Sequence, residues 1–284
     1  MTLEPIELRS VISDTAKEVA EQESILQAAS LAPRQVYEVI RREGSDELAR
    51  PASSLVWSGL AAGIMIGVSV LAESVMLTYL PDEPWRPLVA SFGYSLGFLI
   101  VILGRMQLFT ENTLTTVLPV MSHPNARMFG SLARLWIIVL TANVAGAVLV
   151  AAAFALTPLV SAEFLPAMTA VSHHATDLPA AINFARAVPA GVLVAAIVWM
   201  LPQAVADSFF VITVFTWLIA VCGFTHVIVG SVEIAFLVIR GEAGLAHAVF
   251  GFFLPTLAGN IVGGTVIFAL MARGQVRMEL VAEL

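Results

Sequence analysis

Long apolar runs separated by short polar turns dominate the chain from residue 55 onward. A membrane-spanning helix needs about 20 mostly apolar residues, and the pattern predicts six such spans. The predicted spans cover residues 55–80, 88–120, 132–156, 187–201, 209–239 and 249–271. Residues 157–183 are only weakly apolar and are predicted to form a loop. The pattern therefore predicts an all-α membrane protein.

The second and fifth spans are too long for one straight crossing, and each carries a polar motif in its middle. The motifs are LFTEN at 108–112 and GFTH at 223–226. A glutamate such as Glu111 or a histidine such as His226 is costly at bilayer depth unless it meets protein partners or a water-filled cavity. We therefore predict that the helix is broken at both motifs.

The two breaks also indicate an internal repeat. Three spans per half give the halves opposite orientations in the bilayer, and each half has its broken span in the middle. The sequence match pairs Phe-Thr-Glu at 109–111 with Phe-Thr-His at 224–226. An inverted repeat of this kind places its site at the interface between the halves.

Composition supports a membrane protein and argues against several other classes. The chain of 284 residues is 58% hydrophobic and 12% charged, whereas soluble domains are roughly 25% charged. The net charge of −7 disfavours nucleic-acid binding. We see no nucleophile–base set, metal-ligand cluster or nucleotide loop, so an enzyme is disfavoured and no cofactor is expected. The adjacent His173 and His174 are interpreted as a solvent-exposed pair.

Arginine and lysine placement predicts the orientation. These residues concentrate before the first span, after the second and in the tail, and the positive-inside rule therefore places both termini in the cytoplasm. The predicted location of the protein is the inner membrane of the cell. We predict an N-terminal segment at 1–53, a channel domain at 54–273 and a tail at 274–284. Residues 31–48 fit either an amphipathic helix on the membrane surface or a solvated helix.

Small residues recur every fourth position in two spans. Gly59, Gly63 and Gly67 do so in the first span, and Gly259 and Gly263 do so in the sixth. Such stripes let membrane helices approach closely. We expect these two spans to pack against each other or against a neighbouring subunit.

Four stretches together resemble the formate/nitrite transporter family, the formate and nitrite channels of bacteria. They are GRMQLFTEN at 104–112, GFTH at 223–226, LAGNIVGG at 257–264 and TANVAGA at 141–147. They occur in the order expected for the family and cover the region from 55 to 272. Each motif is weak alone, whereas the ordered set is fairly specific.

The resemblance implies a fold, an assembly and a site. Family members have six helices in an aquaporin-like arrangement, and they form homopentamers in which each subunit has its own pore. The residues matching Thr110 and His226 lie at the pore centre, and the one matching Asn260 lies close by. Hydrophobic constrictions lie on either side, for which Leu108, Phe109 and Phe224 are the candidates here.

The chain also departs from the formate-channel pattern. Thr225 replaces a glutamate, Gly230 replaces an asparagine, and the loop before the fourth span carries no lysine, although Arg186 offers a positive charge nearby. Arg105 and Glu111 are unlike the formate-channel version of the first motif. These differences indicate a divergent branch and leave the substrate open.

Each candidate residue has a functional and a structural interpretation. His226 either exchanges a proton with the substrate or bonds a carbonyl freed by the break. Thr110 and Asn260 either orient the substrate and the histidine or satisfy the broken backbone. Glu111 is expected to pair with Arg105 or to cap the half-helix that follows. The roles of two further acidic residues in apolar spans stay open: Glu73 and Glu233.

The predicted function is a channel or secondary transporter for a small monovalent anion or its conjugate weak acid. A central histidine exchanging protons would let a weak acid cross uncharged and avoid much of the cost of burying a charge. The alternative is an aquaporin-like pore for water or a small neutral solute. The expected partners are the substrate, the lipid bilayer and further copies of the chain.

Overall fold

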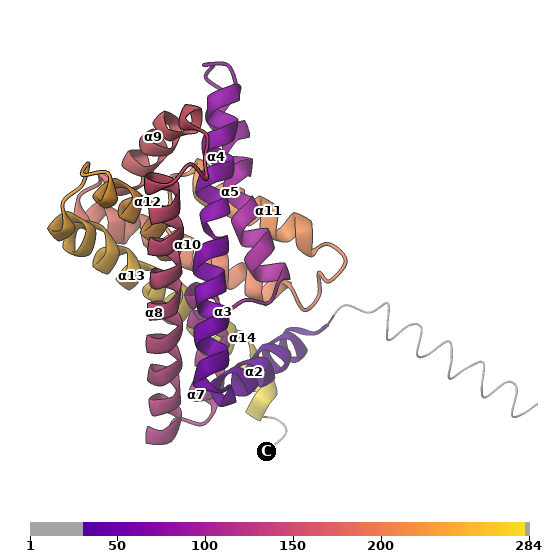
Figure 1. Cartoon of the computed structure of the whole chain (residues 1–284). Coiled ribbons are helices and arrows are strands. Elements are labelled where there is room, and N and C mark those ends of the chain that lie inside the picture. Colours follow the sequence, from indigo (N-terminus) through magenta and orange to yellow (C-terminus); the bar gives the residue numbers. More distant parts are fainter. Residues whose placement is uncertain (1–30, 282–284) are drawn as a thin grey trace, which may run out of the picture.

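The computed structural model describes residues 31–281, which are almost entirely helical (Figure 1). In this part of the chain, 5 helices are long and apolar enough to cross a membrane. They are Ala52–Tyr79, Arg86–Leu103, Ala126–Leu156, Ala180–Met200 and His247–Met278. The predicted fifth span consists of two shorter apolar helices, α11 (Ser208–Val221) and α12 (Val227–Ile239). The predicted all-α membrane fold is therefore confirmed.

The second and fifth spans are broken, as predicted. Helix α5 (Arg86–Leu103) stops before the first polar motif, and the chain resumes with α6 (Phe109–Thr115) and α7 (Val117–Ser122). Helices α11 and α12 are separated in the same way by the second motif. The broken backbone is tolerated because it is buried in protein rather than facing lipid.

The first and last spans are made of successive helical segments. The first span comprises α3 (Ala52–Met65) and α4 (Gly67–Tyr79). The last span comprises η2 (His247–Phe253), α13 (Leu254–Ile261), η3 (Val262–Ala269) and α14 (Leu270–Val281), in which η2 and η3 have π-helical hydrogen bonding. Such π segments widen the turn and are frequent near functional sites.

The region 157–183 is not the loop that the sequence predicted. It contains the short η1 (Ala162–Phe164) and helix α9 (Leu165–Thr176), and α10 (Ala180–Met200) begins earlier than the predicted residue 187. Pro166 lies in the first turn of α9, where its missing N–H is tolerated. Met168 and Val171 of α9 are buried, and the helix packs against α4 and α12. Its few buried apolar positions were too sparse to predict a helix from the sequence.

The glycine stripes pack within each half and not between the first and last spans. Helix α3 packs against α8 (Ala126–Leu156), and a Cβ on Gly63 would overlap the Asn143 carbonyl oxygen. Helix α10 packs against α13 and η3, and a Cβ on Gly191 would overlap the Asn260 carbonyl oxygen. The expected contact between the two stripes is therefore wrong, because each stripe faces a neighbouring span of its own half. The two contacts repeat each other, as the inverted repeat requires.

Helix α2 (Pro33–Ala49) lies across the end of the bundle that carries α7 and α14 (Figure 1), which we call the α2 side. Val36, Tyr37 and Ile40 are buried in a cluster with side chains of α6 and α7. The Tyr37 hydroxyl lies 3.1 Å from the Ser122 hydroxyl. The apolar face of α2 is thus covered by protein. The sequence had left two alternatives for this helix, a position on the membrane surface or in solvent.

Helix α9 lies at the opposite end of the bundle, which we call the α9 side. His173 is not the free exposed side chain that the sequence suggested: its Nδ1 lies 2.7 Å from Asp177 Oδ2 and its Nε2 lies 3.2 Å from Glu242 Oε2. Glu242 also accepts a hydrogen bond of 2.6 Å from Arg240 Nε. This network ties α9 to the turn that follows α12.

The attachment of α9 is expected to weaken as the pH rises. Hydrogen bonds with Asp177 and then Glu242 raise the pKa of His173 above its ordinary value of 6.5, although burial acts the other way. The stabilisation is therefore fully present below about pH 6.5 and is lost as the pH rises through the raised pKa. It is small, because the His173 side chain is 35% exposed.

The measurement is hydrogen exchange of α9 in the wild type and His173→Gln between about pH 5.5 and 8.5. Exchange should be faster in the variant at low pH, and the two proteins should converge at high pH. A difference that does not change with pH would contradict the assignment.

Candidate functional site

The two helix breaks have the same backbone geometry. Each begins with a residue in the left-handed region, Arg105 with φ 51° and Gly223 with φ 61°. In both, the next residue donates its N–H to the carbonyl five positions earlier. Each break ends at an extended residue that precedes a new half-helix, Leu108 (φ −103°, ψ 126°) and His226 (φ −112°, ψ 125°). Leu108 and His226 are therefore equivalent positions of the repeat.

This equivalence corrects the register predicted from the sequence. The Phe-Thr dipeptides at 109–110 and 224–225 are not matched in space, because Phe109 corresponds to Val227 and Thr110 to Ile228. The repeat preserves the backbone break rather than the dipeptide. Glycine is the usual residue at a positive φ, as at Gly223, but the first break has Arg105 there. The two breaks therefore share a backbone turn without sharing a residue type. The two halves consequently bring different side chains to the centre.

Asn143 of α8 holds the first break in place. Its Oδ1 accepts a hydrogen bond of 2.9 Å from the N–H of Phe109, the first residue of α6. Its Nδ2 donates bonds of 2.8 Å to the carbonyls of Gly59 and Gln107. Sequence reasoning missed this role, although an asparagine inside an apolar span was a usable signal.

Asn260 of α13 does the same for the second break. Its Oδ1 accepts 2.9 Å from the N–H of Val227, and its Nδ2 donates 2.8 Å to the Ala187 carbonyl and 3.0 Å to the Thr225 carbonyl. Asn260 is fully buried. Its amide is committed to backbone groups, so the structure places it as a support of the loop and not as a substrate contact.

His226 and Thr110 meet between the two breaks. Thr110 Oγ1 lies 2.8 Å from His226 Nε2, and His226 Nδ1 accepts a 3.3 Å bond from the Val229 N–H. This network assigns the proton of the neutral ring to Nε2, which donates to Thr110. The exposed fraction is 2% for His226 and 0% for Thr110. The Thr110 hydroxyl hydrogen has no acceptor among residues 31–281 and can donate to a substrate.

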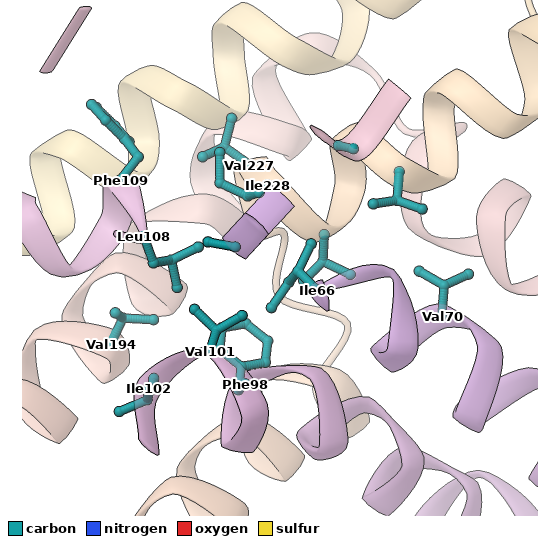
Figure 2. Packing of buried hydrophobic residues seen from close by; sticks show 14 of the residues in the cluster. Ile66, Val70, Phe98, Val101, Ile102, Leu108, Phe109, Val194, Val227 and Ile228 are labelled. Atoms are coloured by element: carbon teal, nitrogen blue, oxygen red, sulfur yellow. The ribbon is translucent and has the colours of Figure 1, made fainter. Parts of the chain in front are cut away.

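Apolar side chains surround this polar pair. The Phe98 ring meets the His226 ring edge to face, with centroids 5.0 Å apart at 75°. Figure 2 shows Leu108 near Phe98 and Val101 in one buried cluster. Phe109 points instead toward Trp136, with ring centroids 5.5 Å apart. Leu108 is thus buried in the same apolar cluster as Phe98, and Phe109 packs against α8. The constriction expected at Leu108, Phe109 and Phe224 stays a prediction.

A cavity lies on each side of the centre. The α9-side cavity has a volume of about 50 Å³ and reaches His226. Phe224 and Thr225 also line it, and the Thr225 hydroxyl donates 2.9 Å to the Asn183 carbonyl. The α2-side cavity has a volume of about 460 Å³ and is lined by residues that include Gln107 and Glu111. The two cavities approach the centre from opposite ends of the bundle.

The three charged candidates do not act as one group. Arg105 forms an ion pair of 3.8 Å with Glu43 of α2, so the expected pair with Glu111 is not formed. Glu111 lies in the first turn of α6, with Oε1 buried and without a hydrogen-bond partner. Arg186 Nη1 donates 3.4 Å to the Gly223 carbonyl and lies on the α9 side of the break. Of the three, Arg186 is the one that contacts the second break.

Gly230 has a packing explanation. A Cβ at this position would overlap the Phe252 ring, which comes from η2 and lines the α9-side cavity. The space that a larger side chain would take on α12 is therefore filled from the last span.

Broken helices whose ends converge on one buried polar pair, in two halves of opposite orientation, define a membrane channel of the inverted-repeat class. A family model described as formate/nitrite transporter matches residues 34–273. The chain therefore belongs to the formate/nitrite transporter family.

Individual relatives agree with this assignment. The chain is 42% identical over 275 residues to "Inner membrane protein YfdC" of Escherichia coli, covering 97% of this chain and 88% of the relative. It is 24% identical over 247 residues to "Formate channel FocA" of Haemophilus influenzae, covering 76% and 84%. A solved "Pentameric formate channel with formate bound" has the same fold, with a TM-score of 0.69, 22% identity, and coverage of 80% and 98%.

Proposed function

We propose that this protein is a channel or secondary transporter for a small monovalent anion or its conjugate weak acid. The observation that carries the proposal is the buried Thr110–His226 pair, 2.8 Å apart and enclosed by apolar side chains. The names of the similar formate channels support the same substrate class. Membership of a transporter family supports a transport function rather than catalysis.

The pair offers hydrogen-bond donors to a substrate that has left water. His226 Nε2–H and the Thr110 hydroxyl can both turn toward a carboxylate-like oxygen once their mutual bond is broken. A charged anion in this apolar setting stays costly, which favours passage as the neutral acid. Proton uptake by His226 would occur at Nδ1 and would break the bond from the Val229 N–H.

We further propose that the chain resides in the inner membrane with both termini in the cytoplasm and assembles as a homopentamer. The relative named as an inner membrane protein supports the location, and the solved pentameric channel supports the assembly. Arginine-rich segments flank the membrane domain on the α2 side, and the positive-inside rule makes that side cytoplasmic. The proposed segments are the N-terminal segment at 1–53, the channel domain at 54–273 and the tail at 274–284.

Flux measurements in liposomes test the proposal. Purified protein is reconstituted, and uptake of formate, nitrite, acetate and hydrosulfide is followed between about pH 5 and 8 against empty liposomes. At least one anion should enter faster than in empty liposomes, with a rate that increases with acidity because the neutral acid becomes more abundant. Osmotic water or neutral-solute flow without anion flux would overturn the proposal and favour a neutral-solute pore.

A further inference from the structure

The α9-side cavity contains two carboxyl groups that the proposed function does not use. Glu73 of α4 and Glu233 of α12 both line it, together with Tyr94 of α5 and with His226 itself. Glu233 is 4% exposed and Tyr94 6% exposed, and the polar atoms of neither side chain form a hydrogen bond within residues 31–281. These buried polar groups face the same small space as the central histidine.

The two carboxyls cannot both be ionised at low cost. An isolated carboxylate loses much of its hydration when it is buried, and two like charges in one cavity repel each other. Glu73 and Glu233 line the same cavity, whose volume is about 50 Å³. One proton on the pair relieves the repulsion, as in other paired carboxyl sites.

No positively charged group among residues 31–281 forms an ion pair that would favour ionisation of both carboxyls. His174 of α9 lines the cavity, and Arg186 of α10 lies at its rim against Gly223. Neither forms an ion pair with Glu73 or Glu233 in residues 31–281. The remaining lining groups of η2 and of α11 are uncharged.

His226 is poorly placed to serve as the proton donor itself. Its Nε2–H is directed to Thr110, and its Nδ1 accepts the Val229 N–H. Loss of the Nε2 proton from the neutral ring would leave an imidazolate, which is not accessible near neutral pH. A donor with a carboxyl proton in the same cavity avoids this difficulty.

We propose that Glu73 and Glu233 form the proton-exchange site of the α9-side half of the pore. A protonated carboxyl of the pair gives up its O–H proton to an oxygen of the substrate anion, which becomes the neutral acid, while the carboxyl becomes a carboxylate. The carboxylate is reprotonated from the solution on the α9 side. The substrate then passes the apolar ring around His226 uncharged.

This inference rests on the proposed function, and its test separates the two. Flux of formate is measured in liposomes for the wild type, Glu73→Gln, Glu233→Gln and the double variant, between about pH 5 and 8. Glu83→Gln, an exposed residue between α4 and α5, is the matched control. Glutamine keeps the shape of each side chain and removes only the exchangeable proton, and size-exclusion chromatography verifies that each variant is assembled.

The expected difference lies in the pH profile. In the double variant the flux should follow the neutral acid supplied by the solution and fall about tenfold per pH unit above the pKa of formic acid. In the wild type and Glu83→Gln the flux should fall less steeply, because the pair supplies the proton. At about pH 5 the proteins should agree within about twofold, where the solution supplies more neutral acid.

Two outcomes overturn the inference. If the double variant keeps the wild-type slope, the carboxyl pair has no part in proton exchange, while the proposed function stands. If the wild type itself carries no weak acid, or carries small cations instead, the proposed function fails and this inference fails with it.

Discussion

Replacing His226 with phenylalanine is expected to remove most of the substrate flux while the protein still assembles. The change removes the Nε2–H donor at the centre and leaves Thr110 without its partner at 2.8 Å. A hydrogen bond to a charged group contributes about 1.5–3 kcal/mol, which is lost when the bond cannot form. At about 1.4 kcal/mol per tenfold, the flux should fall by at least about tenfold, and by more where the phenyl ring also narrows the pore. Formate uptake in liposomes measures it.

A second substitution separates loss of function from loss of structure. His226 also begins α12 by accepting the Val229 N–H, and phenylalanine cannot do so. His226→Asn retains a side-chain acceptor that suits the start of a helix, but its short side chain cannot reach Thr110. It should therefore assemble as well as the wild type and still lose most of its flux. Wild-type flux in either variant would exclude the central role of His226.

The spans and their breaks could be predicted from the sequence because the physical constraint is strong. Apolar runs must be long enough to cross the bilayer, and polar residues such as Glu111 and His226 inside them are expensive. The meeting of Thr110 and His226 was implied by the family resemblance, and the structure brings them within hydrogen-bond distance. Their exact partners depend on helices distant in sequence.

Other parts could not be predicted, for identifiable reasons. The register of the repeat is carried by backbone dihedrals at Arg105 and Gly223, which share no residue type. Helix α9 buries few apolar residues because it packs on the end of the bundle. Glu73 and Glu233 lie on different spans, so only the fold reveals that they share a cavity. The sequence thus identifies costly residues but not the contacts that offset their cost.

Substituting the two supporting asparagines is expected to cause the largest loss of stability. Asn143→Ala and Asn260→Ala each remove three hydrogen bonds to backbone groups buried at a helix break. A buried backbone group left without a partner costs about 1–3 kcal/mol, so the loss of three such bonds should cost each variant about 3–9 kcal/mol. That corresponds to a fall in Tm of roughly 10 °C or more. Thermal unfolding in detergent measures the change.

Asn125→Ala is the matched control. Asn125 precedes α8; its side chain accepts a hydrogen bond of 3.0 Å from the Met128 N–H and donates one of 3.0 Å to the His123 carbonyl. Both bonds are exposed, so the loss of this helix cap should cost about 1 kcal/mol. Because Asn143 and Asn260 occupy equivalent positions of the repeat, their two variants should lose similar stability. If Asn143→Ala lowers the stability and Asn260→Ala does not, the two breaks are held by different interactions. Equal losses would instead mean that an asparagine side chain holds the break in each half of the pore. The residues that follow each break, such as Thr110 and His226, can then differ between the halves.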